Sequence, residues 1–158
     1  MVIALNAIAF QVAWFACVLG AAYGAPWIGV IVMLTVIGLH LSRASDKASE
    51  LKLILMAGIV GAVAEGALMA SGIVSYVAPW LGFATLMNVS MAWMKNRYVL
   101  ATVLGLLFGP LSYIAGEKLG GMTILEPRMI GITAIAVMWA MAMPLLVRLG
   151  ETWNVFLK

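Results

Sequence analysis

The 158-residue chain carries little charge: 9% of its residues are charged and 65% are hydrophobic. A soluble domain usually has about 25% charged residues, so these few charges cannot cover a water-facing surface. The single cysteine, Cys17, excludes a disulfide within the chain. The single histidine, His40, argues against a His-based metal site or a Ser–His catalytic pair. We interpret it as a side chain that fills space at the membrane interface and has no catalytic role. The sequence has no phosphate-binding loop, and Ser112 does not lie in a nucleophile elbow.

Apolar residues occur in long runs, and several runs reach the roughly 20 residues that a helix needs to cross the hydrocarbon core of a membrane. The six predicted spans are Ile3–Ala22, Pro26–Leu41, Leu51–Ala70, Ala78–Met94, Tyr98–Ala115 and Arg128–Val147. No Lys or Arg precedes the first run, so we expect a retained helix and not a cleaved signal. The expected fold class is all-α: a polytopic membrane protein with six transmembrane helices in three hairpins, forming a single helical-bundle domain over residues 1–158.

The few basic residues gather at one end of the predicted hairpins. If both termini are cytoplasmic, the outer side holds only Lys118 and Arg128. The cytoplasmic side then holds Arg43, Lys47, Lys52, Lys95, Arg97, Arg148 and Lys158. The positive-inside rule therefore predicts cytoplasmic N- and C-termini in a bacterial inner membrane. The tail at residues 148–158, RLGETWNVFLK, is predicted to lie along the inner interface.

One heptad occurs twice: YGAPWIG at Tyr23–Gly29 and, 53 positions later, YVAPWLG at Tyr76–Gly82. A proline suits the first position of a helix, and a tryptophan beside it suits headgroup depth. We therefore predict that both copies start a helix that returns from the outer surface, with Trp27 and Trp80 at the interface. Pro127 is predicted to start the sixth helix in the same way. A duplication that produced two parallel repeats is the alternative to this turn chemistry.

Small residues recur every four positions in the third and fifth spans. They are Gly58, Ala62, Gly66 and Ala70 in the third span, and Ala101, Gly105 and Gly109 in the fifth. Such stripes let helix backbones approach closely inside lipid. These two helices are therefore predicted to form the packed centre of the bundle, although an exposed stripe could equally support a dimer.

Glu65 is the only carboxylate placed well inside a predicted span, about 9 Å from the outer end. A charged acid at that depth is costly, so the side chain should face the bundle or a wet cavity. The polar residues predicted to share an outer-half cluster with Glu65 are Gln11, Thr85, Asn88, Ser112 and Tyr113. Glu65 is then either a titrating or ligand-binding group, or a neutral acid that locks the bundle by bonding Asn88 or Tyr113. Asn88 and Gln11 have the further alternative of simple interhelical hydrogen bonding.

The segment GPLSYIAGEKLGG, at Gly109–Gly121, is the second candidate for a site. Pro110 removes a helix hydrogen bond, so the fifth helix is predicted to kink or break there and free carbonyl groups near Glu65. Glu117 and Lys118 are expected at the outer rim. An ordinary proline kink followed by a solvated Glu–Lys pair is the alternative.

Three segments carry a resemblance to a known family: NAIAFQVAWFACVLGA at Asn6–Ala21, the Pro-Trp-Leu helix with Asn88 at Pro79–Trp93, and above all GPLSYIAGEKLGG. With these segments, the chain resembles over nearly its whole length the uncharacterised bacterial family called domain of unknown function 2878. The resemblance implies a small inner-membrane protein with no established activity. Members of this family often belong to gene groups for modified membrane fatty acids, including cyclopropane-type synthases, and this context implies a lipid-linked role.

Three functions are compatible with these features. The first is a non-enzymatic membrane protein that binds a lipid or apolar small molecule in an outer-half polar cavity and assists lipid modification or stress response. The second is a small proton-coupled transporter with Glu65 as carrier, although no convincing inverted repeat supports it. The third is a lipid-modifying enzyme with Glu65, Tyr113 and Glu117 as acid or base groups. Expected partners are membrane lipids and either a second copy of the chain or a lipid enzyme; no nucleic acid, metal or cofactor is expected.

Overall fold

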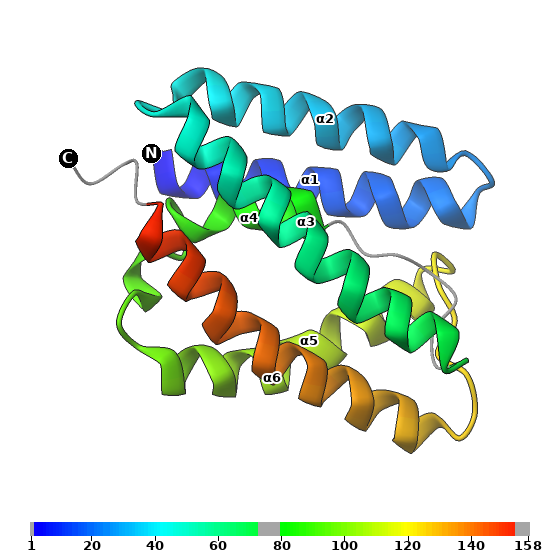
Figure 1. Cartoon of the computed structure of the whole chain (residues 1–158). Coiled ribbons are helices and arrows are strands. Elements are labelled where there is room, and N and C mark those ends of the chain that lie inside the picture. The colour runs from blue at the N-terminus through cyan, green and yellow to red at the C-terminus, as the bar shows by residue number, and fades with distance from the viewer. Residues whose placement is uncertain (1, 73–79, 154–158) are drawn as a thin grey trace.

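The computed structural model describes residues 2–72 and 80–153, and these residues form helices joined by turns (Figure 1). The α-helices are α1 (Val2–Ala22), α2 (Pro26–Arg43), α3 (Lys47–Ala70), α4 (Trp80–Met87), α5 (Tyr98–Lys118) and α6 (Arg128–Thr152). A short 3-10 helix, η1 (Ala92–Met94), lies between α4 and α5. Five of these helices, all except α4 and η1, are long and apolar enough to cross a membrane. The all-α, multi-pass membrane fold is therefore confirmed.

The starts of the helices follow local sequence signals. Pro26 occupies the first turn of α2, as predicted, whereas Pro127 precedes α6 as its N-cap residue. α3 begins at Lys47, four residues before the predicted start, because the side chain of Asp46 accepts hydrogen bonds from the N–H groups of Ala48 and Ser49. α6 runs on to Thr152, so the first part of the predicted interfacial tail is helical, and residues 154–158 lie outside the described residues.

The fourth predicted span, Ala78–Met94, differs most from the structure. Of its described residues, 80–94, only the 8 residues of α4 are α-helical, and turns and η1 follow them. Eight residues rise about 12 Å, less than half the thickness of the hydrocarbon core. The α-helix ends just before Asn88 and Ser90, whose side chains form hydrogen bonds to neighbouring helices. Irregular backbone is tolerated at membrane depth when it is buried in protein; Asn88 and Met94 of this segment are buried, residues 89–92 are half-buried and Trp93 is exposed.

The two copies of the heptad have different structural roles. Trp27 is 62% exposed at the start of α2, as expected of an interfacial residue. Trp80 is 3% exposed and lies against Gly61 of α3, nine residues from the end of that helix, hence about 13 Å deep. The prediction that Trp80 lies at headgroup depth is wrong, because its indole fits the space that Gly61 leaves inside the bundle. Residues 76–79 of the second copy lie outside the described residues.

The helices form two hairpins with other elements between them. α1 packs on α2 and α5 packs on α6, while α4 contacts α1, α2, α3 and α6 (Figure 1). One end of the bundle, called the basic end below, holds the α2–α3 connection, residues 88–97 and the end of α6. The described basic residues of this end are Arg43, Lys47, Lys52, Lys95, Arg97 and Arg148. The opposite end holds Lys118 and Arg128, so the structure groups the charges as the positive-inside prediction requires.

Only one of the two predicted small-residue stripes packs as expected. Gly105 and Gly109 leave no room for a Cβ beside Trp139, so this stripe joins α5 to α6. On α3 the residues Ala62, Gly66 and Ala70 are exposed. The buried row of α3 is displaced by one position and contains Ala57, Gly61 and Glu65. α3 and α5, the two helices predicted to form the packed centre of the bundle, have different main partners: α5 packs mainly on α6 and α3 mainly on α4.

Candidate functional site

A buried hydrogen bond joins Glu65 of α3 to Tyr113 of α5 in the half of the bundle away from the basic end. Both side chains are buried, and the Tyr113 hydroxyl donates to Glu65 Oε1. The sequence interpretation included this pairing. The bond connects two helices that make few other close contacts in the described part of the chain. A carboxyl and a phenol therefore form a buried polar pair in this half of the bundle.

The helix rows that pack most closely also direct these two side chains inward. Glu65 follows Gly61 by four residues on α3, and Tyr113 follows Gly109 by four residues on α5. Residues four apart share one face of a helix. The glycines that let other helices approach therefore place the carboxyl and the phenol in the same interior, one turn further from the basic end.

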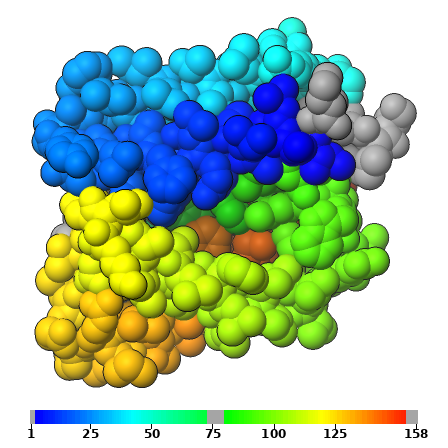
Figure 2. Space-filling view, turned by 180° about the vertical axis from the view of Figure 1, so that it is seen from behind, coloured from blue at the N-terminus to red at the C-terminus, as the bar shows by residue number. Residues whose placement is uncertain are grey.

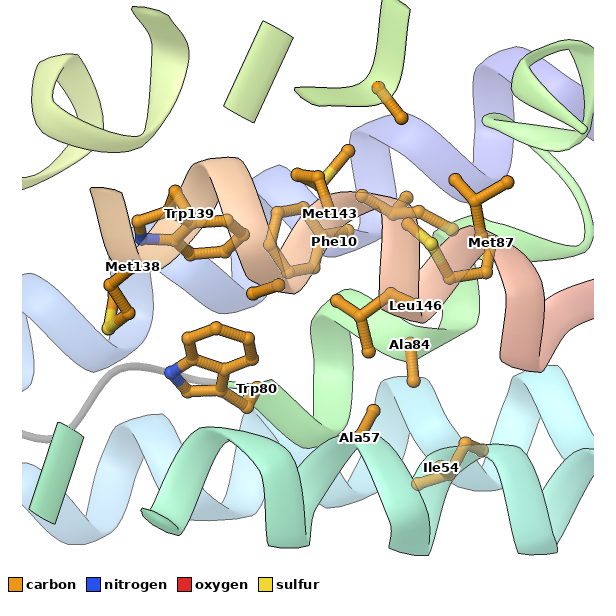
Figure 3. Close-up of a cluster of buried hydrophobic side chains, with 14 of the residues drawn as sticks. Phe10, Ile54, Ala57, Trp80, Ala84, Met87, Met138, Trp139, Met143 and Leu146 are labelled. Atoms are coloured by element: carbon orange, nitrogen blue, oxygen red, sulfur yellow. The ribbon is translucent and has the colours of Figure 1, made fainter. Parts of the chain in front are cut away.

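Two stacked tryptophans lie against these glycines. The rings of Trp80 and Trp139 are nearly parallel, with centroids 4.5 Å apart and an interplanar angle of 12° (Figure 3). Phe83 meets Trp139 edge-on at 5.1 Å and meets Phe10 of α1 edge-on at 5.7 Å. An aromatic run therefore leads from the stack to α1.

An opening between α1 and α5 leads inward from the surface. Figure 2 shows it as a hollow bounded by these two helices, with atoms of α6 visible at its floor. The two helices make few close contacts and are connected at the two ends of the opening. At the basic end, Ser90 donates to Asn6 Oδ1 at 2.6 Å, and at the opposite end Gly121 packs against the backbone of Val18. Because the hollow lies between these closures, it faces the hydrocarbon zone of a membrane.

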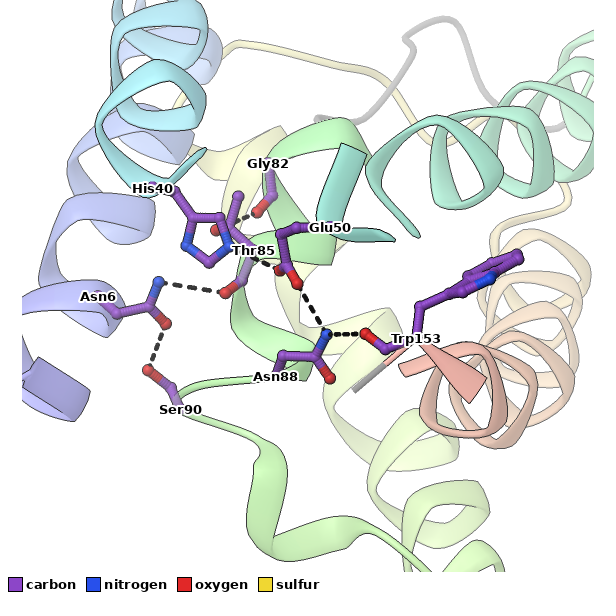
Figure 4. A network of polar contacts seen from close by, with 8 residues as sticks. All are labelled: Asn6, His40, Glu50, Gly82, Thr85, Asn88, Ser90 and Trp153. Carbon is purple, nitrogen blue, oxygen red and sulfur yellow. Dashed lines mark hydrogen bonds and ion pairs between the residues drawn. The ribbon is translucent and has the colours of Figure 1, made fainter. Parts of the chain in front are cut away.

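A second buried polar network joins four elements at the basic end. His40 Nε2 lies 2.7 Å from Glu50 Oε1, linking α2 to α3. Asn88 Nδ2 donates to Glu50 Oε2 at 2.9 Å and to the carbonyl oxygen of Trp153 at 3.1 Å (Figure 4). The three side chains of His40, Glu50 and Asn88 are all buried. The network therefore holds the end of α6 and the segment after α4 against α2 and α3.

Four buried polar atoms have no hydrogen-bond partner among the described residues. Two lie at the basic end: Asn88 Oδ1, an acceptor, and Lys95 Nζ, a donor. The other two are the indole nitrogens of Trp80 and Trp139, and both are donors. Burial lowers the pKa of the Lys95 ammonium, and attraction to Glu50 and Glu151 opposes that shift. The basic end thus has a complementary donor and acceptor, whereas the stack has two donors and needs an acceptor from elsewhere.

The structure does not gather the other predicted cluster residues around Glu65. Asn88 lies in the network at the basic end, and the Thr85 hydroxyl donates to the carbonyl of Gly82 at 2.7 Å within α4. Gln11 is exposed on α1. The prediction of a single outer-half cluster is wrong because α4 begins deeper than the sequence suggested, which carries Thr85 and Asn88 toward the basic end.

Pro110 is accommodated within α5 and does not break it. The helix is continuous from Tyr98 to Lys118, and Pro110 is buried in its middle. Ser112 donates to the carbonyl of Gly109 at 2.7 Å, so its side chain bonds within its own turn of the helix. Of the predicted kink or break at Pro110, the break does not occur, and Ser112 acts locally.

Glu117 and Lys118 lie at the opposite end, where a rim was predicted, but Glu117 holds a turn together. Its Oε2 lies 2.7 Å from Arg128 Nη2, and its Oε1 accepts the N–H of Ile124 at 3.0 Å. Lys118 is exposed. The carboxylate therefore fixes the α5–α6 connection, which closes one end of the α1–α5 opening.

Sequence reasoning missed Glu50 and the role of His40. The predicted third span begins at Leu51, which leaves Glu50 in a loop and His40 without a buried partner. The signal that could have revealed the pair is Asp46 followed by Ser49, a helix-start pattern that places Glu50 in the first turn of α3. The two unpartnered indoles had no sequence signal, because only the packing shows that both nitrogens are buried.

Among the described residues, no group of three or more His, Cys, Asp or Glu is placed to hold a metal ion. The chain matches the family described as "Protein of unknown function (DUF2878)" over residues 3–145. No curated protein and no solved structure matches it. The resemblance drawn from the sequence is therefore confirmed, and the function has to be argued from the geometry.

Proposed function

Because the chain belongs to the DUF2878 family, whose description gives no activity, we propose from its geometry that it is a non-enzymatic membrane protein that binds a lipid or another apolar small molecule. The binding site is the interior reached through the α1–α5 opening, with the Glu65–Tyr113 pair as its polar part. Its role is accessory to the modification of membrane lipids or to a stress response.

The opening between α1 and α5 is the observation that carries this proposal. A hollow in the hydrocarbon zone, floored by α6, admits a molecule that is already dissolved in the membrane (Figure 2). The interior behind it is lined by the aromatic run from Phe10 to the tryptophan stack. Small-molecule sites are typically concave and mostly apolar, with a few polar groups that fix orientation. This interior has that composition.

Glu65 and Tyr113 provide the polar groups. An ionised acid inside a membrane span is unfavourable by at least a few kcal/mol, so such acids usually face a partner or a functional cavity. Here the partner is a phenol on another helix, and the pair lies one turn beyond the stack. A bound molecule that reaches this depth meets both a hydrogen-bonding pair and a large apolar surface.

The proposal is tested by native mass spectrometry of gently extracted protein. The unaltered chain should retain a defined lipid or apolar molecule, and Glu65→Ala should remove it. Glu126→Ala is the matched control, because Glu126 is an exposed acid in the α5–α6 connection and should leave the bound molecule in place. A random lipid complement that is the same in all three proteins would contradict binding.

The accessory role has a separate test in the lipid composition of the membrane. Deleting the gene should change the amounts of modified lipids, because an assisting protein is then missing. An unchanged lipid composition under growth and stress conditions would contradict this role and leave the binding result standing.

A further inference from the structure

The two stacked tryptophans present a pair of buried hydrogen-bond donors with no acceptor. Trp80 and Trp139 are 3% and 7% exposed, and neither Nε1 has a hydrogen-bond partner among the residues that the structure describes. An indole N–H can donate and cannot accept. Buried donors are almost always paired, so two neighbouring exceptions require an explanation.

Both donors point to the same place. Figure 3 shows the two indole nitrogens on the same side of the stack, away from Ile54 and Ala57, in the direction in which α3 continues to Glu65. The stack lies against Gly61 and Gly109, and the Glu65–Tyr113 pair follows one turn, about 6 Å, further along both helices. The two indole nitrogens therefore lie on the side of the stack toward which α3 runs on to Glu65.

The donors define the chemistry of a ligand. A cation would face two N–H groups of like polarity, whereas a group with acceptor oxygens would satisfy both. The rings are nearly parallel with centroids 4.5 Å apart, so one ligand group can face both donors. The carbonyl oxygen of a carboxylic acid or an ester has two lone pairs and can accept from both indoles. An anion is costly to bury in this apolar interior, so the uncharged forms fit best.

The aromatic run gives the rest of the molecule a path. Phe83 contacts Trp139 and then Phe10, which lies on α1, one wall of the opening. An acyl chain attached to the ester or acid group can therefore extend from the stack toward the membrane along aromatic surface.

We propose that the stacked indoles of Trp80 and Trp139 bind the ester or uncharged carboxylic acid group of an acyl lipid, whose chain extends through the α1–α5 opening. This proposal depends on the proposed lipid-binding function and names the chemical group that the site recognises. The two indole N–H groups supply the hydrogen bonds, and the apolar surroundings favour an uncharged group.

The test titrates three probes with the same chain into the purified protein in detergent micelles: methyl oleate, oleic acid and heptadec-8-ene, which has no oxygen. Native mass spectrometry gives the occupancy at each mole fraction. Methyl oleate or oleic acid should bind at least about 10-fold more tightly than the hydrocarbon, since each hydrogen bond contributes roughly a 3- to 10-fold gain. Tighter binding of methyl oleate indicates an ester lipid as the source, and tighter binding of oleic acid at low pH indicates a free fatty acid.

Trp80→Phe and Trp139→Phe keep an aromatic ring and remove one donor each. Each should weaken the oxygen-bearing probe about 3- to 10-fold and leave heptadec-8-ene unchanged, whereas Trp27→Phe, on the exposed face of α2, should change neither. Equal binding of all three probes to the unaltered chain would overturn the proposal even if a variant failed to fold, and saturable binding would then still support the lipid-binding function. No saturable binding of any probe would contradict both.

Discussion

The two buried polar regions of this protein differ in whether their own residues can satisfy one another. At the basic end, Glu50 is bonded by His40 and Asn88, and Asn88 also holds the backbone at Trp153. In the middle of the bundle, Trp80 and Trp139 have donors without acceptors beside the Glu65–Tyr113 pair. The unpaired atoms of the basic end are one donor and one acceptor, whereas those of the stack are both donors.

This difference separates a structural network from a binding site. The basic-end network joins α2, α3, α6 and the segment after α4 (Figure 4). Loss of this network should therefore lower the free energy of unfolding. The region around the stack lies behind an opening and contributes few hydrogen bonds between helices. Substitutions there should therefore mainly lower the fraction of the protein that carries a bound ligand.

The largest effect is expected at Glu50. Glu50→Ala leaves His40 and Asn88 without their shared acceptor in a buried site, so the free energy of unfolding should fall by about 3–5 kcal/mol. Unfolding in mixed micelles with increasing SDS measures it. Glu50→Gln, which keeps one oxygen, should lose less. A loss below about 1 kcal/mol for Glu50→Ala would show that the network does not hold the basic end together.

A smaller loss is expected when a methyl group is placed under the stack. Gly61→Ala sets a Cβ against the ring of Trp80, so overpacking should lower stability by about 1–3 kcal/mol and reduce lipid occupancy. Gly66→Ala, on the exposed face of α3, meets no neighbour and should stabilise the helix by up to about 1 kcal/mol. The two variants differ only in the face of α3 that they alter. Equal melting behaviour would mean that the buried row of α3 is assigned incorrectly.

Glu65→Gln should have little effect on stability. Tyr113 can still donate to the amide oxygen, so the free energy of unfolding should change by less than about 1 kcal/mol. The same substitution at Glu50 should be more harmful, because Glu50 accepts bonds from two other elements. SDS titrations of the two variants in parallel provide the comparison. A greater loss for Glu65→Gln would place the structural network in the wrong half of the protein.

The smallest effect is expected at Lys95. Burial lowers the pKa of its ammonium from 10.5, so the charged form is less favourable in the folded state than in the unfolded state. Lys95→Met should therefore stabilise the protein slightly at pH 7. As the pH rises through the lowered pKa toward 10.5, the folded protein loses this proton and the advantage of Met should shrink. Lys52→Met, at an exposed position, is the control, and an advantage that grows with pH would contradict the account.

Much of the helix layout could be predicted from the sequence because it depends on local properties. Five of the six spans predicted from long apolar runs are helices long enough to cross a membrane, and basic residues group at one end. The glycine row of α5 is closely packed, as predicted, although its partner α6 was not predicted. The Glu65–Tyr113 contact also follows, since a buried acid needs a partner and few polar side chains lie at its depth.

The depth of α4 could not be predicted, because it depends on contacts between distant segments. From the sequence, the tryptophan of each heptad is predicted to lie at the membrane interface, and the depth of other residues is measured from it. Trp80, however, fits beside Gly61 and stacks on Trp139 inside the bundle. Asn88 is then brought to Glu50, 38 positions away in the chain. Two similar heptads thus have different surroundings, and the surroundings determine where each one lies.

Binding of a lipid inside the bundle is tested most directly by photolabelling with a methyl oleate analogue that carries a diazirine on its acyl chain. If the lipid enters through the α1–α5 opening, the label should appear on interior residues such as Phe83, Met138 and Met143, and an excess of methyl oleate should remove it. Label confined to outward-facing residues such as Val63 and Leu107, and insensitive to competitor, would contradict the central claim that the protein binds a lipid in its interior.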